Sequence, residues 1–100
     1  MTKPIAVDPY VLDVLMRDLV GHDHSPSSFI VYLHLYANAR GRSTSPVLAS
    51  HQQIAESVGL SKSAVQTAIR NLLRRRLLQV SRQSPTAIPE YRVLRPWRSR

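Results

Sequence analysis

Apolar residues recur at three- and four-residue intervals near the start of the chain, in "DPYVLDVLMRDLVG". This is the period of an amphipathic helix. Asp8 suits the N-cap, Pro9 suits the first helical position and Gly21 suits a stop. The pattern predicts a helix over residues 9–20.

The next segment, "SPSSFIVYLHLYANARG", repeats the signal of a capping residue followed by proline, at Ser25 and Pro26. It predicts a second helix over residues 26–40, with Gly41 as its end. Apolar side chains cover much of its circumference, which is typical of a helix at the centre of a core.

Two short helices are predicted around Gly59. Ser50 and Gln53 have the spacing of a capping box, which opens a helix over residues 51–58. Gly59 is expected to end that helix in the left-handed conformation. The small residue Ala55 fits the close contact that a helix-turn-helix requires.

Ser61 is expected to cap the following helix, residues 62–75, which has two contrasting sides. At about 100° per residue, the inward side is apolar: Val65, Ala68, Ile69 and Leu72. The outward side contains only residues that can form hydrogen bonds, and none is acidic: Ser63, Gln66, Thr67, Arg70 and Arg74.

After the run "RRR" the period changes to partial alternation, which predicts strands over residues 77–82 and 90–94. The connection contains Pro85 and Pro89 and reads as a long hairpin loop. A very short strand is also predicted in "VLA" before the third helix. The predicted fold class is α+β, mainly α, with the whole chain, residues 1–100, forming one domain.

The basic residues are concentrated in the second part of the chain. Residues 1–39 contain two basic and four acidic residues, a net charge of −2, whereas residues 40–100 contain twelve basic and two acidic residues, a net charge of +10. Arginine accounts for twelve of the fourteen basic residues, and its planar guanidinium suits phosphates and guanine edges. Such a distribution is the electrostatic footprint of a nucleic-acid-binding protein.

Other chemistry has little support in the sequence. The chain has no cysteine, which excludes disulfides and thiolate metal sites, and no window resembles a signal peptide or a membrane span. We therefore expect a soluble cytoplasmic protein associated with the nucleoid. The "HDH" at residues 22–24 lacks the spacing of a structural zinc site and is interpreted as a polar turn. No catalytic triad or phosphate loop is present, so we predict no enzyme, cofactor or metal.

The stretch "HQQIAESVGLSKSAVQTAIRNLLRRRLLQVSR" resembles the winged helix-turn-helix unit of bacterial transcription regulators such as the GntR and MarR families. The resemblance implies a helix-turn-helix over residues 50–76, with a recognition helix over 61–75 and a wing over 77–94. Arg76 stands where these families usually have glycine. GntR-type regulators also have a separate effector-binding domain that is not expected here, so no small-molecule effector is predicted.

On this interpretation, double-stranded DNA is the partner, and the recognition helix lies in the major groove. Four residues are expected to read bases: Ser63, Gln66, Thr67 and Arg70. Six are expected to contact phosphates or to act from the wing: Ser61, Lys62, Arg74, Arg75, Arg82 and Gln83. For Arg75, an equal alternative is that it complements the negative end of the helix dipole.

Three functions remain open from the sequence. The first is a transcriptional regulator that occupies an operator as a homodimer, with the acidic segment 1–41 as scaffold and dimerisation surface. The second is a plasmid or phage replication or partition protein. The third is a winged helix that binds an acidic protein. The basic tail, residues 95–100, is expected to be loose, and the sequence assigns no role to Trp97 within it.

Overall fold

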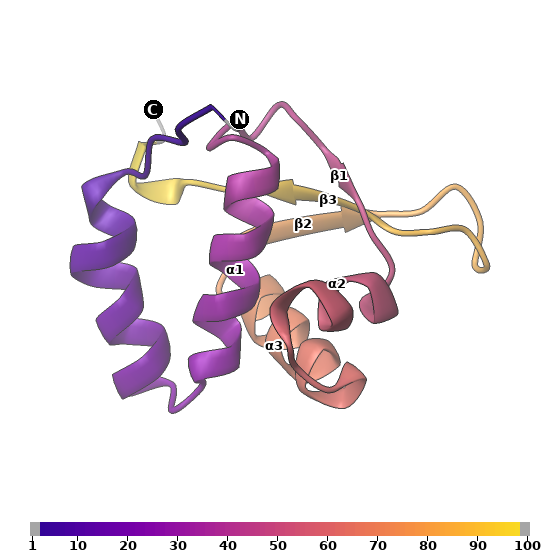
Figure 1. Ribbon diagram of the computed structural model, residues 1–100, viewed down its shortest axis with the longest axis horizontal. Helices are drawn as coiled ribbons and strands as arrows, with labels where there is room; N and C mark the ends of the chain where they lie inside the picture. Colours follow the sequence, from indigo (N-terminus) through magenta and orange to yellow (C-terminus); the bar gives the residue numbers. More distant parts are fainter. Residues whose placement is uncertain (1–2, 99–100) are drawn as a thin grey trace.

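The computed structural model describes residues 3–98. Its helices, strands and short turns follow the chain in this order: η1 (Val11–Leu15), η2 (Arg17–His22), α1 (Pro26–Asn38), β1 (Val47–Leu48), α2 (His51–Val58), α3 (Lys62–Arg74), β2 (Leu78–Ser81), β3 (Glu90–Val93) and η3 (Pro96–Arg98). The helices form one body from which the β2–β3 hairpin projects (Figure 1). The predicted fold class, α+β and mainly helical with a winged helix-turn-helix, is confirmed.

The N-terminal helical segment is a π-type helix in two parts, η1 and η2, because its hydrogen bonds span five residues, as from Asp23 N–H to Asp18 C=O at 2.9 Å. Asp8 caps it by accepting a hydrogen bond from Tyr10 N–H at 3.1 Å. The predicted stop at Gly21 is wrong. Gly21 lies inside η2, and the left-handed residue that ends the segment is His24, with φ of 52°.

Helix α1 is central to the core, as predicted, and packs against η2, α2, α3 and β3. It ends at Asn38, two residues before the predicted boundary, because Arg40 and Gly41 both take positive φ angles. A Cβ on Gly41 would lie 3.2 Å from the Tyr36 hydroxyl oxygen, so glycine allows the close approach of the chain to this ring.

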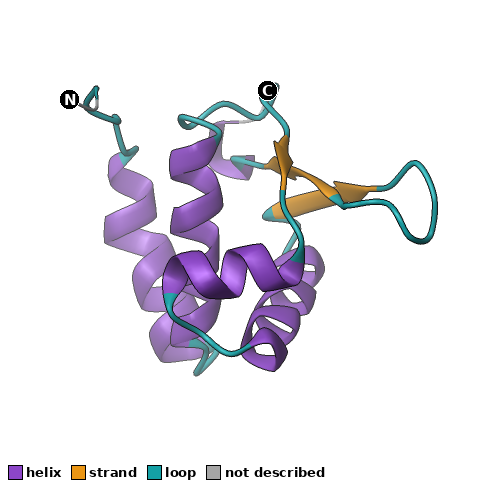
Figure 2. Cartoon of the chain, turned by 45° about the vertical axis from the view of Figure 1, so that its right-hand side comes forward, coloured by secondary structure: helices purple, strands orange, loops and turns teal. Residues whose placement is uncertain are grey.

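The three strands form an antiparallel sheet with the order β1–β3–β2. Val47 pairs with Tyr91, and Leu78 pairs with Val93. The predicted short strand and hairpin are confirmed, each hairpin strand being shorter than expected. The sheet turns Tyr91 and Val93 into the core, while the loop beyond Ser81 extends away from the helices (Figure 2).

Arg76 stands where the resemblance leads us to expect glycine, and it adopts the left-handed conformation that glycine favours. It takes φ of 59° and ends α3 in a Schellman motif. The motif's two hydrogen bonds run from Arg76 N–H to Leu73 C=O at 3.0 Å and from Leu77 N–H to Leu72 C=O at 2.9 Å. Helix α3 therefore ends at Arg74, one residue before the predicted boundary, and the chain turns directly into the hairpin.

The C-terminal turn is anchored to the start of the chain, which corrects the prediction of a loose tail for residues 95–98. Trp97 stacks on Tyr10, with ring centroids 4.6 Å apart. Its Nε1–H also donates a hydrogen bond to Asp8 Oδ2 at 2.9 Å. Residues 99–100 of the predicted tail lie outside the described residues.

Candidate nucleic-acid interface

The turn between α2 and α3 is built from local hydrogen bonds. The Ser50–Gln53 capping box is present, with both reciprocal bonds. Gly59 takes φ of 78° and, together with Leu60, donates its N–H to Ala55 C=O. The capping box fixes the start of α2, whereas the bonds of Gly59 and Leu60 close the turn after which α3 crosses α2 (Figure 2).

Helix α3 separates a buried side from an exposed side as its sequence predicts. The buried side packs on the core through Val65, Ala68, Ile69 and Leu72. Of the four residues predicted to read bases, Ser63, Thr67 and Arg70 are exposed and Gln66 is half-buried. Arg70 donates from NH2 to Thr67 Oγ1 at 3.3 Å, so its guanidinium lies along this exposed face.

The N-terminus of α3 is open to an anion. The Ser61 hydroxyl caps it by accepting from Ala64 N–H at 3.1 Å, and Lys62 is exposed in the first turn. The first N–H groups of a helix carry partial positive charge, which adds to the Lys62 ammonium.

His51, at the start of α2, lies near these cations. A cleft of about 240 Å³ lies between the starts of α2 and α3 and the wing loop, and it is lined in part by His51, Lys62 and Arg82. Partial burial, together with the positive charges of Arg82 and Lys62, lowers the pKa of His51. The potential here favours a negatively charged ligand. The sequence could not predict that His51 and Arg82 line the same clefts, because the two residues are thirty-one positions apart.

A second cleft of about 380 Å³ runs between the exposed side of α3 and the hairpin, and Gln66, Arg70 and Arg82 are among its lining residues. Arg82 also closes the wing loop, donating from NH1 to Ala87 C=O at 3.0 Å. Gln83 follows it on the exposed loop. The two clefts share Arg82 and His51, so four of the candidate residues line one continuous surface: Lys62, Gln66, Arg70 and Arg82.

Arg75 is one of the predicted DNA contacts, but in the structure its guanidinium pairs with Asp23. Its Nε donates to Asp23 Oδ2 at 2.6 Å, and its NH2 donates to Asp23 Oδ1 at 2.7 Å. This ion pair ties the C-terminal end of α3 to the turn before α1 and occupies the guanidinium. We therefore leave Arg75 out of the DNA contacts. Arg74 remains, with a side chain that is 69% exposed and a hydrogen bond to Asn71 Oδ1.

Asp23 has a structural role that the "HDH" pattern did not reveal. The hydrogen bonds from Arg75 are the main reason that its pKa lies far below the usual range, and bonds involving His22 and Asn71 add to the effect against the opposing cost of burial. Among residues 3–98, no group of three or more His, Cys, Asp or Glu side chains is placed to hold a metal ion. Nor does any helix in that range have the length and apolarity needed to cross a membrane.

Comparisons with known proteins identify the fold. No protein-family model matches this chain, and a search of curated proteins finds no match. Membership of the GntR or MarR family is therefore not shown. Among solved structures, the AntR antimony-specific transcriptional repressor is similar over 96% of this chain and 75% of its own, with a TM-score of 0.51 and 20% sequence identity. The two proteins share a fold.

Proposed function

We propose that this chain is a regulator that binds double-stranded DNA in a sequence-specific manner. The observation that carries the proposal is the continuous surface formed by the exposed side of α3 and the wing. The polar residues that line its two clefts are basic or hydrogen-bonding, and none is acidic. The wing's Glu90 lies outside both clefts. The fold shared with a transcriptional repressor supports the same conclusion.

In the proposed complex α3 lies in the major groove. Ser63, Gln66, Thr67 and Arg70 face the bases there, where Gln66 can pair with adenine and Arg70 with guanine. The remaining contacts go to phosphates, which set the position of the protein without reading sequence: His51, Ser61, Lys62, Arg74, Arg82 and Gln83.

The proposed regulator acts as a homodimer, since one recognition helix reads few base pairs. Support comes from three apolar residues on the N-terminal helical segment that remain exposed in the single chain: Leu12 (48%), Met16 (39%) and Val20 (38%). Their four-residue spacing places them on one side of the segment, where a second copy would cover them. Sedimentation equilibrium of the protein and of Met16→Glu tests this, and a monomer at all concentrations contradicts it.

Operator occupancy is the simplest mechanism for such a regulator, which would act in the cytoplasm at the nucleoid. The antimony specificity of the structural neighbour is not part of the proposal, because this chain has no cysteine thiolate, the ligand that soft metals prefer.

The test is a selection of random duplex DNA on the purified protein at two salt concentrations. An enriched palindrome supports a dimeric regulator. Enriched tandem repeats indicate a replication or partition role instead, and binding without a motif contradicts base reading. No binding at low salt contradicts the proposal altogether.

A further inference from the structure

A second basic surface lies at the other end of the hairpin from the wing loop. We call it the arginine groove. It has a volume of about 430 Å³ and is lined by Ser43, Arg76, Leu94, Arg95, Pro96 and Arg98. None of these residues lines the two clefts beside α3 and the wing. The groove lies where the chain passes from α3 into the hairpin and where it leaves the hairpin after β3 (Figure 1). The groove is therefore near the C-terminal end of α3, and the exposed N-terminal half of α3 is at the other end of that helix.

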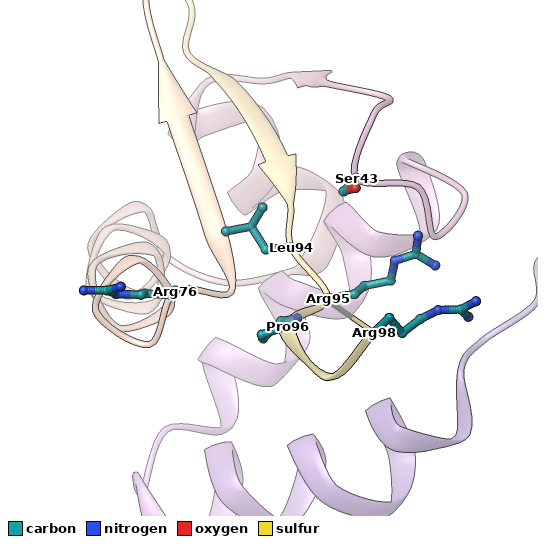
Figure 3. Close-up of a pocket in the computed structure, with 6 residues that line it drawn as sticks. All are labelled: Ser43, Arg76, Leu94, Arg95, Pro96 and Arg98. Carbon is teal, nitrogen blue, oxygen red and sulfur yellow. The ribbon is translucent and has the colours of Figure 1, made fainter. Parts of the chain in front are cut away.

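The cations of the arginine groove stand on both sides of an apolar centre. Figure 3 shows Leu94 and Pro96 in the middle, Arg76 on one side with its guanidinium directed outward, and Arg95 and Arg98 together on the other side. Ser43, from the loop after α1, lies on the same side as Arg95. A ligand in this groove would therefore cover apolar surface at its centre and have arginine side chains beside both of its ends.

The centre of the groove is rigidly held by the fold. Leu94 N–H donates to Leu77 C=O at 2.9 Å, and Leu94 C=O accepts from the hydroxyl of the buried Tyr32 at 2.8 Å. Pro96 begins the turn that Trp97 anchors. A site that is already ordered loses little conformational entropy when it binds a ligand.

The guanidinium groups have unused hydrogen-bonding capacity. Between residues 3 and 98, Arg98 makes an ion pair with Asp8 at 3.3 Å, whereas Arg76 and Arg95 make none. Within the same range, the buried Nε of Arg95 has no hydrogen-bond partner, although buried N–H groups are nearly always paired. Because this Nε is shielded from solvent, an anion in the groove would pair with the terminal nitrogens of the Arg95 guanidinium.

We propose that the arginine groove binds an acidic peptide segment of a partner protein, with carboxylates at Arg76 and Arg95 and an apolar side chain over Leu94 and Pro96. Arginine pairs with carboxylates through two parallel hydrogen bonds, which gives both energy and orientation. A nucleic-acid backbone would satisfy the arginines equally well, but its phosphates have no apolar group to cover the centre. This favours the peptide. The inference does not depend on the proposed function.

The probe is a fluorescein-labelled synthetic peptide, Glu-Asp-Glu-Leu-Leu-Glu-Asp-Glu, with binding followed by anisotropy at low salt. A second probe replaces the two leucines with serines. The protein variants are Arg76→Gln and Arg95→Gln, and Arg17→Gln is the control because Arg17 is an exposed arginine on η2 outside the groove. If Arg95→Gln fails to fold, Arg76→Gln, which changes an exposed side chain, keeps the test informative.

We expect the leucine peptide to bind more tightly than the serine peptide. Arg76→Gln and Arg95→Gln should each weaken binding of the leucine peptide about tenfold, because each removes one charged hydrogen-bonding partner. Arg17→Gln should leave binding unchanged. Equal binding to all variants would mean unspecific charge attraction and would overturn the proposal, as would no binding at all.

Duplex DNA separates the groove from the proposed DNA surface. We expect the peptide and DNA to bind at the same time. Displacement of the peptide by DNA would show that the peptide occupies the surface of α3, which overturns the groove assignment. Weaker DNA binding by Arg76→Gln and Arg95→Gln, without peptide binding, would make the groove a second DNA contact instead. If DNA does not bind but the peptide does, the proposed function fails and this inference stands.

Discussion

Asp23 and Arg75 are joined by two hydrogen bonds, of 2.6 and 2.7 Å, across 52 positions of sequence. The Asp23 side chain is 6% exposed and that of Arg75 is 25% exposed, so water screens the pair only weakly. Asn71 joins the pair to Ser28, donating from Nδ2 to Asp23 Oδ2 and to Ser28 Oγ at 3.0 Å. The network fixes the exposed helix α3 to the helical scaffold.

Asp23→Asn should destabilise the fold by about 1–3 kcal/mol, because Arg75 would lose its charged partner in a largely buried position. The free energy of unfolding in urea, followed by circular dichroism, measures the effect. Asp13→Asn is the matched control, because Asp13 is exposed on η1. Equal losses for the two variants would contradict the structural role of Asp23.

The same ion pair predicts a pH dependence. The pKa of Asp23 lies below its unfolded value, mainly because Arg75 donates hydrogen bonds to the carboxylate. Its stabilisation is therefore complete above the ordinary aspartate pKa of about 3.9 and is lost as the pH falls below that value towards the folded pKa. The Tm of the natural sequence should fall in this acid range, and the Tm of Asp23→Asn should fall less. Parallel curves would exclude Asp23 as the source.

Arg76→Gly should stabilise the protein by about 1 kcal/mol, because glycine adopts the left-handed conformation of a Schellman motif without a Cβ clash. Urea unfolding measures the gain. Arg76→Ala is the control: it removes the same guanidinium but retains a Cβ, so no such gain is expected. A similar gain from alanine would mean that charge, and not backbone conformation, limits stability at this position.

Arg70→Ala should cost about 1–3 kcal/mol of discrimination between the selected DNA and a duplex with one altered base pair. The fold should be unaffected, because the Arg70 side chain is exposed and bonds only to Thr67 among the described residues. Titrations of both duplexes measure the difference, with Arg17→Ala as a matched loss of one exposed arginine. Unchanged discrimination would remove Arg70 from the base-reading set.

Lys62→Gln should behave differently from Arg70→Ala. A phosphate contact has no sequence preference, so binding to all duplexes should weaken equally and the slope of log K against log salt should become shallower by about one. Affinities at several salt concentrations measure this slope. A loss confined to the selected duplex would place Lys62 at a base.

Much of the helix-turn-helix was predictable because its signals are local. Ser50 bonds with Gln53, Ser61 bonds with Ala64, and Gly59 takes the conformation that a glycine after a helix is expected to take. The periodicity of residues 62–74 likewise identified the buried and exposed sides of α3. Whether the exposed side reads DNA is a prediction that remains to be tested.

Contacts between distant parts of the chain left no such local pattern. Arg75 has the same neighbours in the sequence whether it meets a phosphate or Asp23, and only the packing of α3 beside the turn before α1 decides between them. Trp97 lies 89 positions from Asp8, so its anchoring role followed only from the fold. Residues close in sequence meet in almost any compact arrangement, whereas these pairs meet only after the whole core has formed.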